Sequence, residues 1–302
     1  MYKFTKLFVN NKVSQSGQYA FMNVSRLEHR VELNNIYYEL SEDETHYTCL
    51  GMINTHDPNS INVTIVDNIY GKPVTIIEDS AFAECELLES VVIPNSVTWI
   101  GDTAFCECLA LKNVTIGNSV TYIGDSAFSN CTALTSIILP DSVNHINYSA
   151  FEMCSALTEV TLGNGITTIS PYAFTDCISL TSINIPGNVK VIGDHAFYNC
   201  RNLQTVTICE GVETIGTSAF VGCINMTSIS IPGSVMWIGI SIIDPYAPFT
   251  TTIPGSFNWY FTDSETDWSN RVGGTSVNER FPDDDTIVWY LHNESGHYFY
   301  KI

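Results

Sequence analysis

A phenylalanine recurs at a fixed step of 23 residues through the middle of this 302-residue chain, and this regularity constrains the fold most. A repeat of this length cannot bury its own apolar face, so successive copies must stack on one another. Three ladders keep the step without insertion: Phe82, Phe105, Phe128, Phe151, Phe174, Phe197 and Phe220; Cys85, Cys108, Cys131, Cys154, Cys177, Cys200 and Cys223; and Leu88, Leu111, Leu134, Leu157, Leu180, Leu203 and Met226. The chain is therefore predicted to be a repeat solenoid.

Each repeat is expected to contain a short strand and a turn. Apolar and polar residues alternate up to Ile116, which indicates a strand with one buried face. Gly-Asp pairs such as Gly101-Asp102 precede an Ala-Phe pair, and this predicts a short helical turn. The aspartate carboxylate is expected to accept hydrogen bonds from the free backbone amides of that turn. Strands stacked about 4.8 Å apart would form a continuous parallel sheet on one face of the solenoid.

The repeat resembles the BspA-like leucine-rich repeats, whose pattern I-G-x-x-A-F-x-x-C-x-x-L-x-x-I-x-I-P is met almost letter for letter. The resemblance is strong over residues 74–239. It implies three parts: residues 1–73 as an N-terminal segment and β-rich cap, residues 74–257 as a solenoid of seven regular units and one degenerate unit, and residues 258–302 as a C-terminal cap.

The ends of the chain support two caps on physical grounds as well. Residues 36–40 and 45–50 flank the acidic stretch 41–44, which predicts a hairpin with a charged tip. Residues 257–261 and 286–290 are expected to cover the far end, because exposed apolar solenoid ends would pair with other chains.

The charge balance limits the partners. Asp and Glu number 32 against 12 Lys and Arg, so the formal net charge is −20 and a nucleic acid or an anionic lipid surface would be repelled. No apolar run reaches about 18 residues, so we expect no transmembrane segment. The first ten residues show no apolar core of a signal peptide.

The ten cysteines allow disulfides, a metal site or plain packing. Ladder cysteines point in parallel and are odd in number, which favours buried free thiols. Zinc needs ligands that converge on one point, whereas a 23-residue step spreads them along a line. We expect no metal and no cofactor; the redox state of Cys49, Cys106 and Cys209 stays open.

The sequence gives no reason to expect an enzyme. Its histidines are scattered, and the G-x-S-x-G, H-E-x-x-H and P-loop patterns are absent. A solenoid also presents an open curved face rather than an enclosed pocket. No catalytic residue is assigned.

Two candidate binding surfaces follow from the repeat. The first, here called the sheet face, consists of the outward residues of the predicted strands, which are mostly hydroxyl and amide side chains. Its members are Ser90, Val92, Asn113, Thr115, Ser136, Ile138, Glu159, Thr161, Ser182, Asn184, Thr205, Thr207, Ser228 and Ser230. Such residues also occur on strands that only face solvent, so both interpretations remain open.

The second surface, here called the aromatic patch, consists of Trp99, Tyr122 and His145, which occupy equivalent positions in successive repeats of the other extended stretch. Trp237 stands at the same position in the last repeat. Neighbouring rings can hold a sugar or anchor a protein contact. Cross-strand packing of the rings is the alternative.

The family resemblance implies a function. It points to an extracellular or cell-surface protein of a host-associated microbe that recognises proteins or glycans of the host or of neighbouring cells. A non-catalytic binding or adhesion module is therefore expected. The alternatives are a structural spacer without its own ligand and an accessory domain that positions the substrate of an enzyme.

Overall fold

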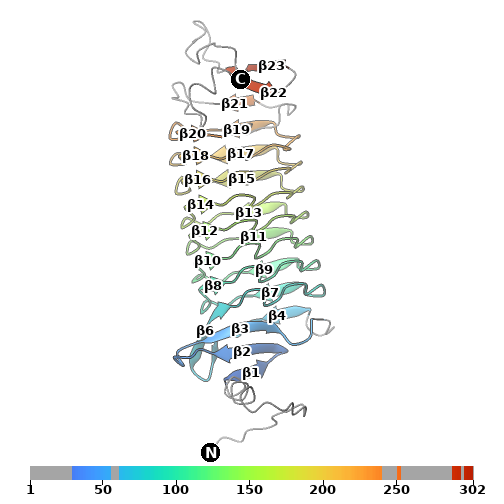
Figure 1. The fold of residues 1–302 in the computed structure, drawn as a ribbon, viewed down its shortest axis with the longest axis vertical. Helices are drawn as coiled ribbons and strands as arrows, with labels where there is room; N and C mark the ends of the chain where they lie inside the picture. The colour runs from blue at the N-terminus through green and yellow to red at the C-terminus, as the bar shows by residue number, and fades with distance from the viewer. Residues whose placement is uncertain (1–28, 56–60, 240–249, 253–287, 294–295, 302) are drawn as a thin grey trace, which may run out of the picture.

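The chain folds into stacked coils. The structure, a computed structural model, describes residues 29–55, 61–239, 250–252, 288–293 and 296–301. Figure 1 shows the coils as parallel rungs along the long axis of the molecule. Strands of successive coils pair in parallel, with each residue opposite the one 23 positions later. Trp99 thus pairs with Tyr122, and Tyr122 pairs with His145. The predicted repeat solenoid is confirmed.

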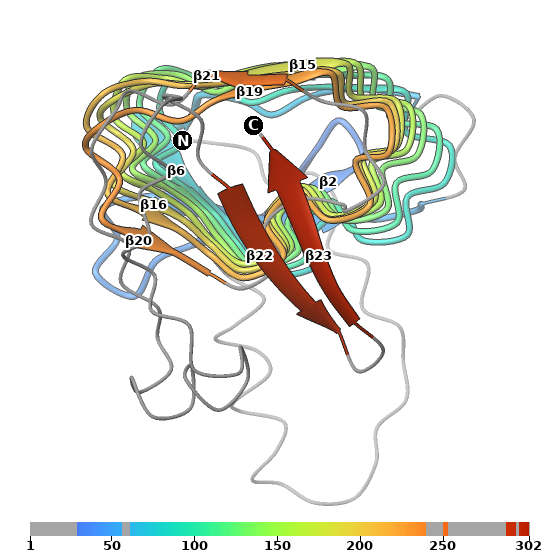
Figure 2. The same ribbon diagram turned by 90° about the horizontal axis from the view of Figure 1, so that it is seen from above.

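Two sets of parallel strands lie on different sides of each coil (Figure 2). One sheet is unbroken along the coils and consists of β6 (Lys72–Ile77), β8 (Trp99–Ile100), β10 (Tyr122–Ile123), β12 (His145–Ile146), β14 (Thr168–Ile169), β16 (Val191–Ile192), β18 (Thr214–Ile215) and β20 (Trp237–Ile238). This long sheet carries the aromatic patch. Its strands are mostly two residues long, because the chain turns immediately after each buried isoleucine.

The sheet predicted around residues 111–116 is present on the other side, but in three pieces. They are β4 (Asn62–Thr64), β7 (Ser90–Val92) and β9 (Asn113–Thr115); β11 (Ser136–Ile138) and β13 (Glu159–Thr161); and β15 (Ser182–Ile185), β17 (Thr205–Ile208), β19 (Ser228–Ser230) and β21 (Thr250–Thr252). All three pieces are parallel.

The phenylalanine ladder forms the centre of the core. Consecutive rings from Phe82 to Phe220 lie with centroids 4.9–5.4 Å apart and planes within 7° of parallel. Every ring is fully buried, as are the cysteine and leucine ladders beside them. Each coil thus completes the apolar interior of its neighbour, as the 23-residue step predicts.

The Ala-Phe segment is not a short helix: the structure has none within the described residues. In one such turn the amides of Ala104, Cys106 and Cys108 donate to the carbonyl three residues back, whereas those of Thr103, Phe105 and Glu107 donate to the next coil. Thr103 and Glu107 have φ of 54° and 60°, and the equivalent residues of every regular coil are also left-handed. A helix needs consecutive right-handed residues, so this alternation excludes one.

The aspartates of the Gly-Asp pairs also differ from the prediction. Asp102 Oδ1 does not accept from the amides of its own turn; it accepts from the Asp125 amide, one coil further on, at 2.9 Å. Asp79, Asp125 and Asp194 each accept a hydrogen bond from a backbone amide of the next coil in the same way. The carboxylates therefore link coils instead of capping turns.

The N-terminal strands extend the long sheet. β1 (Arg30–Leu33), β2 (Ile36–Leu40) and β3 (Tyr47–Met52) are antiparallel, and β3 then pairs in parallel with β6. β5 (Asn68–Ile69) pairs with β6 in antiparallel orientation. Ile36, Tyr38 and Cys49 are buried in the same core as the repeats. The predicted hairpin is confirmed, and it continues the stack of coils at this end.

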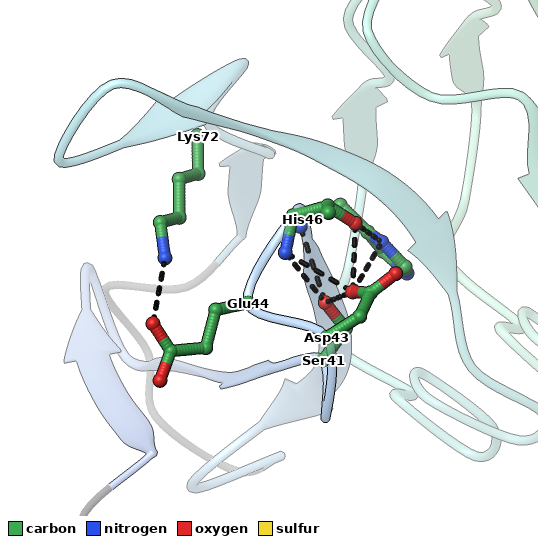
Figure 3. Close-up of polar contacts among 6 residues, drawn as sticks. Ser41, Asp43, Glu44, His46 and Lys72 are labelled. Carbon is green, nitrogen blue, oxygen red and sulfur yellow. Dashed lines mark hydrogen bonds and ion pairs between the residues drawn. The ribbon is translucent and has the colours of Figure 1, made fainter.

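Polar contacts fix the tip of this hairpin (Figure 3). Asp43 Oδ1 accepts hydrogen bonds of 2.7 Å from both the Ser41 and the Thr45 hydroxyls. These bonds lower the pKa of Asp43 to about 2. Glu44 forms an ion pair of 3.6 Å with Lys72, which ties the tip to the start of β6. These contacts link the turn of the N-terminal hairpin to the first coil.

The described C-terminal strands are β21 and an antiparallel hairpin of β22 (Val288–Asn293) and β23 (Gly296–Lys301). The rest of the expected C-terminal cap, including residues 257–261, lies outside the described residues. The boundaries at residues 73 and 257 therefore stay predictions. The described residues contain no helix long and apolar enough to cross a membrane.

Candidate binding surfaces

The side chains of the sheet face point outward. Val91, Ile137 and Ile183, in the middle of their strands, are buried, which turns the residues on either side of them to solvent. Ser90, Ser228 and Ser230 are half-buried and the other members are exposed. Ile138 has the most exposed aliphatic side chain in the row, at 69%.

The sheet face carries almost no charge. Glu159 is its only ionisable member, in a chain whose net charge is −20. Lys112 and Glu89, which flank the row, neutralise each other in an ion pair of 3.1 Å. The face is therefore a strip of hydroxyl, amide and aliphatic side chains on paired strands, suited to hydrogen bonds and apolar contact with a ligand.

The aromatic patch lies on the long sheet. The Trp99 and Tyr122 rings are stacked, with centroids 3.5 Å apart and planes 8° from parallel, and His145 is the next strand partner of Tyr122. Trp99 and His145 are exposed and Tyr122 is half-buried. Trp237, at the same repeat position, pairs with Thr214 and is separated from the patch by three coils.

Three carboxylates line the aromatic patch, and the sequence analysis did not assign them to a binding surface. We call Asp79, Asp102 and Asp125 the carboxylate row; all three are exposed. Burial of the Tyr122 hydroxyl and the charges of these three aspartates raise the pKa of Tyr122. The 23-residue recurrence of aspartate was visible in the sequence, but its hydrogen bond to the next coil was not.

A second group of rings was also missed. Tyr148, Tyr172, His195 and Tyr198 form a chain of ring contacts across three coils, with centroids 5.3, 4.8 and 5.4 Å apart in that order. Tyr172 and His195 are stacked within 3°. Tyr172 and His195 are one repeat apart, but Tyr148 and Tyr198 occupy other repeat positions, so the 23-residue step does not reveal that all four rings meet.

The cysteine ladder is buried and free of disulfides. From Cys108 onward each thiol donates a hydrogen bond to the carbonyl of the phenylalanine 26 residues earlier, at 3.0–3.3 Å. Burial raises the pKa of Cys154 to about 12. Cys49 is likewise free and buried, whereas Cys106 and Cys209 are free and half-buried. In the described ranges no group of three or more His, Cys, Asp or Glu residues could hold a metal ion.

The repeat pattern matches a known family. The family described as BspA type leucine rich repeat region matches residues 75–204 and 167–244, with six copies. The chain belongs to this BspA-type leucine-rich repeat family. Proteins of this family are general repeat scaffolds for protein interaction or for display at a surface. No curated protein matches the chain.

The chain is similar to solved leucine-rich repeat proteins. The crystal structure of a T. pallidum leucine rich repeat protein is 30% identical and covers 65% of this chain and 90% of its own, with a TM-score of 0.59. A leucine rich cell surface protein from Faecalibacterium prausnitzii is 20% identical and covers 82% of this chain and 98% of its own, with a TM-score of 0.39. A Bacteroides ovatus leucine-rich repeat protein is 21% identical and covers 76% and 90%, with a TM-score of 0.38.

Proposed function

We propose that this chain is a non-catalytic binding module, outside the cell or at its surface, that recognises a protein or glycan of a host or a neighbouring cell through the sheet face. The observation that carries the proposal is the near-absence of charge along the outward side of β7 to β19. A chain of net charge −20 that served only as a spacer would gain solubility by spreading its carboxylates evenly over every side.

The sheet face also favours binding energetically. Its side chains stand on paired strands, so little backbone freedom is lost when a ligand is bound. Ile138 lies between the strands that carry Thr115 and Thr161, and an exposed isoleucine among short polar side chains gives an apolar anchor with a polar rim.

The family and the solved relatives support the location and the class of function. The Faecalibacterium prausnitzii protein is described as a cell surface protein, and the family as a whole consists of repeat scaffolds. A binding role outside the cell fits the open, regular outward side of the paired strands.

A binding screen of the purified full chain against extracellular-matrix proteins and a glycan array tests the proposal. At least one ligand is expected, with an affinity that Ile138→Lys weakens by about tenfold or more, because a charge would replace the apolar anchor. Asn118→Lys adds the same charge at an exposed turn off the sheet face and should leave the affinity unchanged. Absence of any ligand, or equal loss in both variants, would support a spacer instead.

A further inference from the structure

The aromatic patch and the carboxylate row form one continuous surface. Asp79 belongs to the coil before Trp99, and its Oδ1 atom accepts the Asp102 amide at 2.8 Å. A Cβ placed on Gly101 would collide with that same oxygen, so the carboxylate lies over the backbone two residues after Trp99. Asp102 lies over Gly124 in the same way, two residues after Tyr122. Each of the two stacked rings therefore has a carboxylate beside it.

Coil stacking does not require these rings. The strand positions equivalent to Trp99 in later coils are held by Thr168, Val191 and Thr214, and these strands pair in the same register. The combination of ring and carboxylate is confined to the first coils. Beside Trp237 the carboxylate position is held by Thr217, whose own amide donates to Asp194.

The stack leaves one face of the Trp99 indole without a ring against it. Tyr122 covers the other face, while the strand partner of Trp99 on the preceding coil is Ile76. Asp79 follows Ile76 by three residues on that coil, and Glu78 beside it is also exposed. The second indole face, which Tyr122 does not cover, therefore lies on the side of the aliphatic Ile76, close in sequence to two exposed carboxylates, and Trp99 as a whole is 42% exposed.

Within the residues that the structure describes, the three carboxylates have no cationic partner. No lysine or arginine in the described part of the chain forms an ion pair with Asp79, Asp102 or Asp125. Each uses Oδ1 for the amide of the next coil, which fixes the side chain in place. A fixed carboxylate beside an aromatic face is complementary to a guanidinium or an ammonium group, which gains both a charge pair and a cation–π contact.

We propose that the aromatic patch and carboxylate row bind an extended basic peptide segment, with an arginine or lysine side chain on the open face of Trp99 and against Asp79. This inference deepens the proposed function, because it adds a second contact surface and names its partner class. A neutral glycan could donate hydrogen bonds to the carboxylates but would form no charge pair with them, and stacking of Trp99 on Tyr122 leaves fewer ring faces for sugar rings.

Fluorescence anisotropy of a labelled peptide of about eight alternating arginine and serine residues tests the inference on the full chain. Trp99→Thr is expected to weaken binding by about tenfold, within the range for one cation–π contact, and Asp79→Asn by about fivefold, the upper range for one exposed charge pair. Threonine is the residue that the chain itself uses at this position in later coils, and asparagine keeps the oxygen that accepts the amide, so both variants should fold.

Two matched controls remove the effect of overall charge. Trp237→Thr and Asp194→Asn make the same chemical changes at equivalent repeat positions that lack the ring and carboxylate pairing, and binding is expected to stay within about twofold of the wild type. Equal weakening by the controls and the patch variants would show attraction by net charge alone and overturn the inference, as would absence of peptide binding.

A third arm separates this inference from the proposed function. Binding of a neutral oligosaccharide that Trp99→Thr abolishes, without peptide binding, would overturn the basic-peptide inference and leave the binding module intact. Ile138→Lys serves as the reverse control: it should not weaken the peptide, because Ile138 lies on the sheet face. Loss of sheet-face ligands in that variant bears on the proposed function only.

Discussion

Asp194 and Thr217, one coil apart, are joined by a hydrogen bond of 2.7 Å from the Thr217 amide to the Asp194 carboxylate. The same bond joins Asp102 to Asp125. The left-handed turns leave these amides without a partner in their own coil, and a carboxylate from the preceding coil accepts them. Polar contacts between coils therefore accompany the apolar ladders in fixing the register of the stack.

Replacement of Asp194 by alanine should loosen this link. The Thr217 amide would lose its acceptor, at a cost of about 1 kcal/mol for an exposed hydrogen bond. Hydrogen exchange at the Thr217 amide should speed up by roughly fivefold on the same basis. Asp194→Asn keeps an acceptor oxygen and should lose less. Unchanged exchange in the alanine variant would show that the bond contributes nothing.

Met153 occupies a left-handed position at φ 60°, where the first two coils have glutamate and four others have Asn130, Asp176, Asn199 and Gly222. Asparagine tolerates this conformation better than methionine does, so Met153→Asn should raise the free energy of unfolding by about 1 kcal/mol. Met236, another exposed methionine, has no positive φ, and Met236→Asn serves as the control. Urea denaturation of the two variants measures the difference; equal midpoints would contradict the argument.

The phenylalanine ladder should be the most sensitive part of the core. Phe151 is fully buried between Phe128 and Phe174, with centroids 5.4 and 5.3 Å away. Phe151→Ala should cost about 3–5 kcal/mol through lost burial and the cavity left behind. Phe151→Leu fills most of that space and should cost markedly less in the same denaturation experiment. Similar costs for the two variants would argue against close packing there.

The buried thiols predict a fall in stability at alkaline pH. Burial raises the pKa of Cys154 from 9.0 to about 12, so above pH 9 the unfolded chain releases a proton that the folded chain retains. Unfolding then becomes easier as pH rises from 9 towards 12, by up to about 1.4 kcal/mol per pH unit for one thiol. Below pH 9 this contribution is constant.

Unfolding free energies at pH 8 and pH 10 measure this effect, and Cys154→Ala should show a smaller fall than the wild type between the two. Burial also raises the pKa values of Cys131, Cys177 and Cys200, so the falls add up along the ladder. Thiol alkylation of the native chain at pH 8 should mark the half-buried Cys106 and Cys209 before any ladder cysteine. Early labelling of Cys154 would contradict its burial.

The ladders and the outward row were predictable from the sequence because the 23-residue step repeats side chains in a fixed direction. Phe105, Cys108 and Leu111 are buried and Thr115 is exposed, as that step requires. The pattern therefore fixes which side chains of each coil face inward.

Contacts from one coil to the next, other than those within the ladders, were not predictable in this way. Methionine and tyrosine do not favour a left-handed backbone, so the conformation of Met153 and Tyr172 was not predictable from the residue types. Their amides donate hydrogen bonds to the next coil, and these bonds hold the conformation. The link from Asp102 to the next coil and the contact of Tyr148 with Tyr172 depend on how one coil lies against another. The local sequence after Gly101 predicted a helical turn, but hydrogen bonds between coils give this segment a different backbone conformation.

Hydroxyl-radical footprinting of the full chain with its ligand bound tests most directly whether the uncharged sheet face is where that ligand lies. Oxidation of Ile138 and Val92 is expected to slow several-fold on binding of a sheet-face ligand, because both side chains are exposed in the free protein. Met153 and Tyr70, exposed elsewhere, should react as before. Unchanged oxidation of Ile138 in a saturated complex would contradict binding through this face.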